Sequence, residues 1–217
     1  MKGINFHFDK LKTNWVIAWQ IRGFRIQLLT TLLFLASIAF FVSNFFRYIE
    51  FRESYRIRDV ILNLIPPVDL SVFTFLFIYS VIILSILNLI SFPFQFLKGL
   101  QAYGLLLSLR LACMYAVPLD TPADLIILKD PFIGYFFYGK MVITKDLFFS
   151  GHVSTLFLLC LLNQVRYLRF LFYFLTFLTA IALLVQHVHY TVDVIAAPFF
   201  AWIAFALSKW IPIKSAV

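Results

Sequence analysis

The chain has 217 residues, of which 63% are hydrophobic and 13% are charged, and its formal net charge is +8 at pH 7. Soluble domains carry roughly 25% charged residues, so the composition excludes a soluble globular protein and predicts one all-α domain in a membrane. The positive charge does not indicate nucleic-acid binding, because Lys and Arg lie in short segments between apolar runs, where they set topology and meet anionic headgroups.

The first segment, residues 1–23, interleaves large apolar and basic side chains. Such a mixture is typical of a helix at the membrane interface with an aromatic belt. A plain basic anchor in front of the first span explains the pattern equally well. The apolar residues are Phe6, Phe8, Leu11, Trp15 and Trp19, and the basic ones are Lys2, Lys10, Lys12 and Arg22.

Six apolar segments follow, and a span needs about 20 mostly apolar residues. A bilayer cannot satisfy open backbone groups, and the runs lack the alternation of barrel strands, so helix is the expected conformation. Residues 24–217 are therefore predicted to form one domain of six transmembrane helices. The expected spans are Phe24–Phe46, Ser71–Phe92, Leu100–Pro118, Leu147–Leu162, Phe170–Val188 and Val192–Ile211.

The distribution of Lys and Arg weakly favours a cytoplasmic N-terminus. The opposite face then holds the two longest connections, 47–70 and 119–146, and most of the carboxylates. Connections of this length are usually functional or disordered. Cys113 and Cys160 both lie inside apolar runs, which indicates packed thiols and neither a disulfide framework nor a zinc site.

Ionisable groups near the ends of these spans are candidates for a site, because they are costly at membrane depth. His152 begins the fourth span, His189 and Asp193 begin the sixth, and Arg110 lies towards the end of the third. With six spans, all four residues reach the same membrane face, whichever way the protein inserts.

These residue types suit phosphoryl transfer. His189 and Asp193 are four residues apart and would share a helix face, so the carboxylate could orient the imidazole as in a catalytic triad. His152 could protonate the leaving oxygen, a contribution of about 10²–10⁴ in rate. Arg110 could clamp phosphate oxygens, and amides at Ser150 and Thr191 could bind an anion. No metal or cofactor is required.

Each feature also has a structural interpretation. A His-x-x-x-Asp pair on a helix is commonly a simple hydrogen bond, and an arginine such as Arg110 can snorkel to the interface. His187 is interpreted as an interfacial group or as a support for the site. The combination of these residues at one face is what favours a site.

Four segments resemble the signatures of the sphingomyelin synthases. Residues 147–156, Leu-Phe-Phe-Ser-Gly-His-Val-Ser-Thr-Leu, follow Asp146 and resemble the third signature. Residues 189–196, His-Tyr-Thr-Val-Asp-Val-Ile-Ala, resemble the fourth. Arg110 precedes Met114-Tyr115 as in the second signature, and Ile65-Pro66-Pro67-Val68-Asp69 is loosely similar to the proline-rich first.

That family lies within the superfamily of type 2 phosphatidic acid phosphatases. The resemblance implies six membrane helices, an extracytoplasmic site and a phosphohistidine mechanism, with His189 as nucleophile, Asp193 as its partner and His152 as acid and base. It also implies transfer of a phosphocholine or phosphoethanolamine headgroup from a glycerophospholipid to a lipid alcohol, ceramide or diacylglycerol. The substrate contacts expected within these signatures are Arg110, Asp146, Ser150, Gly151 and Tyr190.

The chain departs from the family pattern in places. Thr144-Lys145 stands where the family usually has Cys-Gly, and Leu183 stands where the phosphatase branch has an arginine. The second departure favours the synthase-like branch. Two alternatives stay open: a lipid phosphatase or phospholipase C-like hydrolase using the same residues, and a transporter or non-catalytic scaffold.

Overall fold

The computed structural model describes residues 2–129 and 143–212, so part of the connection 119–146 lies outside the described residues. Within that part of the chain it contains seven α-helices and one 3-10 helix, η1 (Leu62–Leu64). The α-helices are α1 (Lys2–Gln20), α2 (Arg22–Phe51), α3 (Ser71–Leu89), α4 (Pro93–Ala116), α6 (Gly151–Leu162), α7 (Arg166–Val185) and α8 (Thr191–Lys209).

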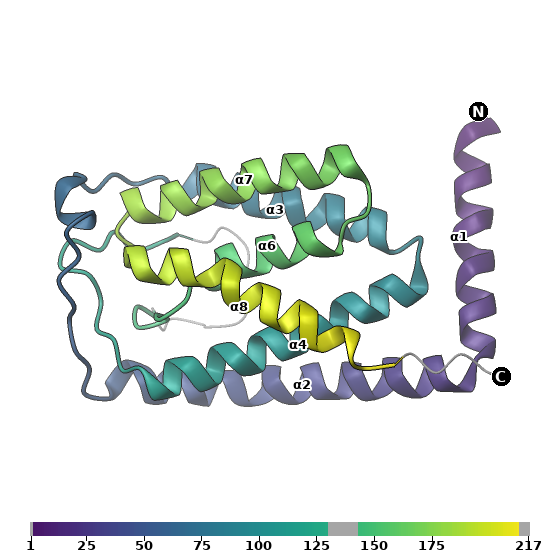
Figure 1. Ribbon diagram of the computed structural model, residues 1–217, viewed down its shortest axis with the longest axis horizontal. Coiled ribbons are helices and arrows are strands. Elements are labelled where there is room, and N and C mark those ends of the chain that lie inside the picture. Colours follow the sequence, from purple (N-terminus) through teal and green to yellow (C-terminus); the bar gives the residue numbers. More distant parts are fainter. Residues whose placement is uncertain (1, 130–142, 213–217) are drawn as a thin grey trace.

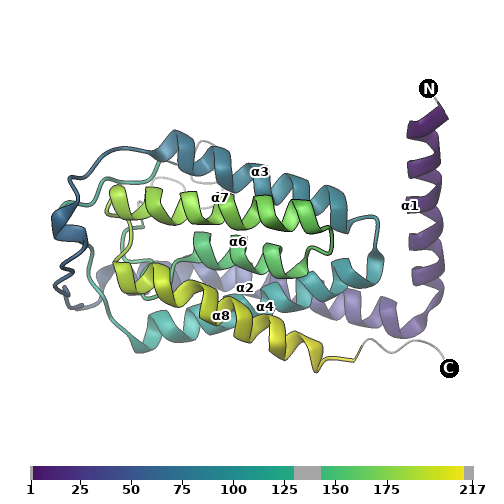
Figure 2. The same ribbon diagram turned by 45° about the horizontal axis from the view of Figure 1, so that its top comes forward.

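Helices α2 to α8 form one elongated bundle in which helices that follow one another along the chain run in opposite directions (Figures 1 and 2). The short helix α6 occupies the centre, where it packs against α3, α4, α7 and α8. Helix α2 lies on the outside and packs mainly against α4. Since α6 carries His152, this arrangement places that histidine inside the bundle and away from its lipid-facing surface.

All six predicted spans contain a helix, and four of these helices are long and apolar enough to cross a membrane: α2, α3, α7 and α8. Helix α6 is apolar but has only 12 residues. The all-helical class and a membrane-integrated chain are therefore confirmed, while membrane spanning by α4 and α6 stays a prediction. The predicted fourth span begins too early, because residues 147–150 are not helical and Ser150 caps α6.

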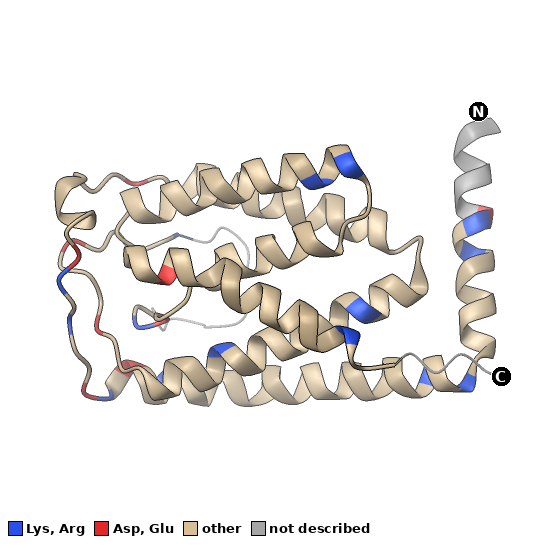
Figure 3. Ribbon diagram, in the orientation of Figure 1, with Lys and Arg blue, Asp and Glu red and all other residues tan. Residues whose placement is uncertain are grey.

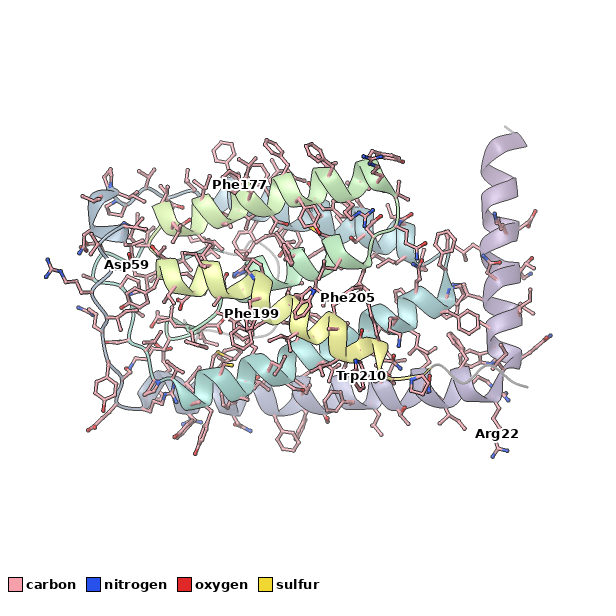
Figure 4. All side chains as sticks on the ribbon, in the orientation of Figure 1. Arg22, Asp59, Phe177, Phe199, Phe205 and Trp210 are labelled. Carbon is pink, nitrogen blue, oxygen red and sulfur yellow. The ribbon has the colours of Figure 1, made fainter. Side chains whose placement is uncertain are left out.

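Small residues allow α8 to approach the centre of the bundle. Ala197, Ala201 and Ala204 recur at helical spacing on one face and are completely buried. Small side chains at such positions permit close helix packing in membranes. The outer surface of the bundle is aromatic in places: Phe177 on α7, Phe199 on α8 and Trp210 just after α8 are exposed (Figure 4), as expected for side chains that face lipid.

Helix α1 lies across one end of the bundle, roughly perpendicular to α2 (Figure 1). Trp15 Nε1 donates to the carbonyl of Ile90 at 2.7 Å, and Asn14 Nδ2 donates to the carbonyl of Ser91 at 2.9 Å, so α1 is fixed to the turn between α3 and α4. A helix in this orientation suits the interfacial role predicted for residues 1–23.

Charged residues gather towards the two ends of the bundle. Figure 3 shows the Asp and Glu residues of the bundle at one end, near the starts of α3, α6 and α8, together with several Lys and Arg, whereas the helix ends on the opposite side carry Lys and Arg. The predicted candidate residues lie towards the end that holds the carboxylates.

Candidate active site

Two histidines face one another at the start of α6 and just before α8. His152 is the second residue of α6, and His189 lies in the turn that joins α7 to α8. Their ring centroids are 6.4 Å apart, and both side chains line the same cavity. The structure thus brings together two imidazoles that are 37 positions apart, 189 minus 152, in the sequence.

Asp193 lies directly behind His189. Its Oδ2 is 3.4 Å from Nδ1 of His189, longer than an ordinary hydrogen bond, and both side chains are buried. The same oxygen accepts the backbone N–H of Tyr190 at 3.1 Å. The prediction that the pair shares a helical face is wrong, because His189 precedes the helix. The contact instead arises where the Asp193 carboxylate folds back over the first turn of α8.

Arg110 binds two protein oxygens in front of α6. The buried guanidinium donates to Asp146 Oδ1 and to the carbonyl of Phe149, and it lies 5.7 Å from the centroid of the Phe149 ring. A Cβ atom at Gly151 would lie only 2.6 Å from Cζ of Arg110, so glycine is needed here for the close approach. Arg110 therefore holds the loop in front of His152.

The backbone of that loop is strained. Phe148 adopts a φ of 92°, a region that side chains rarely occupy. Backbone strain of this kind persists only where surrounding contacts impose it. Phe149 provides one such contact, since its ring stacks on Phe200 with centroids 4.5 Å apart. The strained residue lets the chain turn sharply into α6 immediately before His152.

Ser150 links the start of α6, which carries His152, to the start of α8, which follows His189. Its side chain accepts the Val153 N–H at 3.4 Å and caps α6. Its own N–H donates to the carbonyl of Asp193 at 3.0 Å. The Thr191 N–H is likewise bound, by Asp59 Oδ2 at 2.6 Å. Protein oxygens thus occupy both of these amides, and anion binding by the other amides at the starts of α6 and α8 stays a prediction.

Tyr190 lies behind the site. Its side chain is buried in an apolar cluster with Leu62, Leu119 and Leu147, and its hydroxyl donates to the carbonyl of Asp120 at 2.9 Å. Tyr190, Ser150 and Asp193 do not line the cavity, whereas Arg110, Asp146, Gly151, His152 and His189 do. The substrate contact predicted for Tyr190 therefore has no geometric support.

The cavity in front of the histidines has a volume of about 820 Å³. Most of its wall is aliphatic or aromatic and comes from α2, α3 and α4. The wall residues on α2 run from Leu35 to Phe46, a length of roughly 16 Å at about 1.5 Å per residue. They are Leu35, Ile38, Ala39, Val42 and Phe46, and α3 supplies Phe75, Ile78, Tyr79 and Ile82.

Two further carboxylates, Glu50 and Asp59, hold the segments around the site. Sequence reasoning missed both. Glu50 accepts the N–H groups of Thr144 and Lys145 at 3.0 and 3.1 Å and the Thr144 hydroxyl at 2.6 Å, immediately before Asp146. Asp59 binds the start of α8. No local pattern could reveal either residue, because each pairs with a distant part of the chain.

Together, the fold and the site define a helical membrane protein with two histidines and an aspartate beside an apolar cavity. Residues 145–210 match the family model described as PAP2 superfamily C-terminal, which supports membership of the type 2 phosphatidic acid phosphatase superfamily. The match includes α6, α7 and α8, and hence His152, His189 and Asp193. Members of this superfamily are generally enzymes that act on phospholipids. No curated protein and no solved structure matches the chain.

Proposed function

We propose that this protein is a membrane enzyme that moves a phospho-headgroup from a glycerophospholipid to a lipid alcohol such as ceramide. The headgroup is of the phosphocholine or phosphoethanolamine type. The observation that carries the proposal is the pairing of His152 and His189 on the wall of an apolar cavity, with Asp193 buried behind His189. The resemblance to the sphingomyelin synthases supports the choice of acceptor.

In the first step His189 attacks the phosphorus of the donor lipid. Asp193 lies at Nδ1, which leaves Nε2 as the attacking nitrogen. As the N–P bond forms, the bond from phosphorus to the diacylglycerol oxygen breaks, and His152 gives that oxygen its proton. The products are diacylglycerol and a headgroup phosphate held on His189.

The charge on Asp193 suits this step. Its Oδ1 is buried and accepts no hydrogen bond from the described residues. A partly paired buried carboxylate is costly. The cost falls when the neighbouring imidazole becomes cationic during attack, so Asp193 stabilises the phosphorylated ring more than the free ring.

In the second step the acceptor hydroxyl attacks the same phosphorus from the cavity side. His152, now neutral, takes the hydroxyl proton, the N–P bond breaks, and His189 is restored. Water as acceptor would complete the same cycle as a hydrolysis. The choice between the two depends on whether the cavity excludes water.

The cavity walls favour a lipid acceptor. Apolar side chains from α2 and α3 surround the space next to the histidines, and burying each methylene there is worth about 0.8 kcal/mol. A lipid alcohol can therefore occupy the space beside the phosphohistidine and displace water from it.

Hydrolysis is the second candidate, because the superfamily match suggests lipid phosphatase as well as phosphotransferase chemistry. A phosphatase or phospholipase C-like enzyme would use His152, His189 and Asp193 in the same roles. It would differ only in the acceptor.

We also propose that the N-terminus is cytoplasmic and that the site faces the extracytoplasmic side. The helix ends opposite the site carry Lys and Arg, whereas the site end carries Lys and Arg mixed with the carboxylates (Figure 3), and basic segments are enriched on the cytoplasmic side of membrane proteins.

The test uses purified protein with mixed phospholipids, with and without ceramide or diacylglycerol, and products identified by mass spectrometry. A phosphosphingolipid that forms only with ceramide supports transfer, whereas diacylglycerol or free phosphate released without acceptor selects hydrolysis. His189→Ala should abolish turnover and His152→Ala nearly so. EDTA should leave turnover intact. Wild-type activity in either variant would contradict the mechanism.

A further inference from the structure

The connection between α2 and α3 crosses the turn that carries His189. This turn, residues 186–190, contains His187 in the left-handed region with a φ of 55°. His189 therefore has no helix of its own to hold it. Its position depends on how the two flanks of the turn are fixed.

The α7 flank is held by the second half of the connection. The Val68 N–H donates to the carbonyl of Val185 at 3.1 Å, and the Leu70 N–H donates to Oε1 of Gln186 at 3.2 Å. Nε2 of His187 is 2.9 Å from the carbonyl of Ile65. These contacts fix the chain up to two residues before His189.

The α8 flank is held by Asp59. Its Oδ2 accepts the Thr191 N–H at 2.6 Å, and its Oδ1 accepts the Thr191 hydroxyl at 3.0 Å. Figure 4 shows Asp59 at the end of the bundle beside the start of α8. Thr191 is the first residue of α8, so a carboxylate from a distant connection binds the first amide of this helix, in addition to the capping box of Tyr190 and Asp193, and complements the helix dipole.

Asp59 is itself held in place. Its Oδ1 also accepts the N–H groups of Ile61 and Leu62, both at 3.1 Å, which anchor the carboxylate to the turn that leads into η1. Partial burial alone would raise the pKa of Asp59, but these bonds and those from Thr191 outweigh burial and lower the pKa. The carboxylate is thus charged at neutral pH and fixed from two sides.

We propose that Asp59 is a positioning residue for the phosphoryl transfer, which it serves by fixing the first turn of α8 and so the orientation of His189 relative to Asp193 and His152. The inference rests on the proposed function, and it extends the site to the connection between α2 and α3. A displacement of about 1 Å in a reacting group can cost about 100-fold in rate, so the effect of losing this contact should appear in kcat.

The test compares Asp59→Ala and Asp59→Asn with the matched control Glu53→Gln. Glu53 is an exposed carboxylate in the same connection, two residues after α2 ends at Phe51. Headgroup release should show kcat lower by about 10- to 100-fold for Asp59→Ala, with KM little changed. The control should keep wild-type kcat. Thr191→Val, which removes only the hydroxyl bond, should lose less activity than Asp59→Ala.

A second measurement reports on His189 without turnover. The imidazole NMR signals of His189, assigned with His189→Gln, should shift in Asp59→Asn and stay unchanged in Glu53→Gln. Unchanged His189 signals, or a kcat loss in Asp59→Ala that the control matches, would overturn the inference. If the wild-type protein releases no headgroup, the proposed function fails, while the NMR comparison still decides whether Asp59 positions His189.

Discussion

Oδ2 of Asp193 serves two neighbours at once: it lies 3.4 Å from Nδ1 of His189 and accepts the Tyr190 N–H at 3.1 Å. The backbone bond fixes the carboxylate, and in the proposed mechanism the fixed carboxylate orients the imidazole. Capping of α8 and the proposed activation of the nucleophile would therefore depend on one side chain.

Asp193→Asn should separate these two tasks. The asparagine oxygen can still accept the Tyr190 N–H and cap the helix, so the protein should fold. The amide has no negative charge to stabilise the histidine cation, and we expect kcat to fall by about 10²–10⁴. Asp124→Asn, at an exposed position of a connection, is the control for headgroup release. Wild-type kcat in the Asp193 variant would contradict the role assigned to this carboxylate.

Gly151→Ala should disturb Arg110. The added methyl would lie 2.6 Å from Cζ of Arg110, whose guanidinium has little freedom to move because it binds Asp146 and the Phe149 carbonyl. The loop before His152 should therefore shift, with a loss of about tenfold or more in kcat/KM. Gly99→Ala is the matched control, since its methyl would lie 3.4 Å from the nearest atom, Cδ1 of Leu162. Equal activity in the two variants would show that the contact with Arg110 is unimportant.

The cavity between α2 and α3 should determine which acyl-chain lengths the protein prefers in its lipid donor. Ala39 lies in its wall, and Ala39→Trp should fill part of the space. Excluding about two methylenes, at about 0.8 kcal/mol each, should lower kcat/KM for long-chain donors roughly tenfold. Short-chain, water-soluble donors should be affected much less.

Ala36→Trp provides the control on the same helix, because Ala36 is exposed and does not line the cavity. Initial rates are measured in mixed micelles for donors with acyl chains of increasing length. A loss in Ala39→Trp that is equal for short and long donors would argue against chain binding in this cavity.

The Asp59 contact should have a defined dependence on pH. Because hydrogen bonds outweigh burial and lower the pKa of Asp59 in the folded protein, the contact stabilises the fold above the ordinary carboxyl pKa of about 3.9. That stabilisation is lost as the pH falls through the lower, folded-state pKa. The difference in Tm between the wild type and Asp59→Asn should thus be constant from neutral pH to about pH 5 and vanish in strong acid. If the difference in Tm changed between pH 6 and 7, the stabilisation would belong to another titrating group.

The sequence predicted that the candidate residues lie at the same end of the bundle. This prediction depends mainly on consecutive helices running in opposite directions. His152, His189 and Arg110 lie towards one end of the bundle for this reason. Hydropathy also located six helical segments, although α6 is shorter than expected. Periodicity in the chain is enough for such conclusions, since each helix forms from local hydrogen bonds and buries one face.

The loop contacts could not be predicted in this way. Asp59 and Thr191 are 132 positions apart, and their bond occupies the amide that we expected to bind an anion. Arg110 could not be seen to bind the Phe149 carbonyl, because nothing in the spacing of either residue encodes the contact. The turn before α8 likewise places His189 outside the helix, where the i, i+4 rule does not apply.

The central claim is that His189 carries the headgroup phosphate between donor and acceptor. The most direct measurement is peptide mapping by mass spectrometry after the protein is incubated with a glycerophospholipid and quenched at alkaline pH. The account predicts an acid-labile adduct with the mass of the phospho-headgroup on His189, absent from His189→Ala and depleted when ceramide is added. Turnover without any such adduct, or an adduct on a different residue, would contradict it.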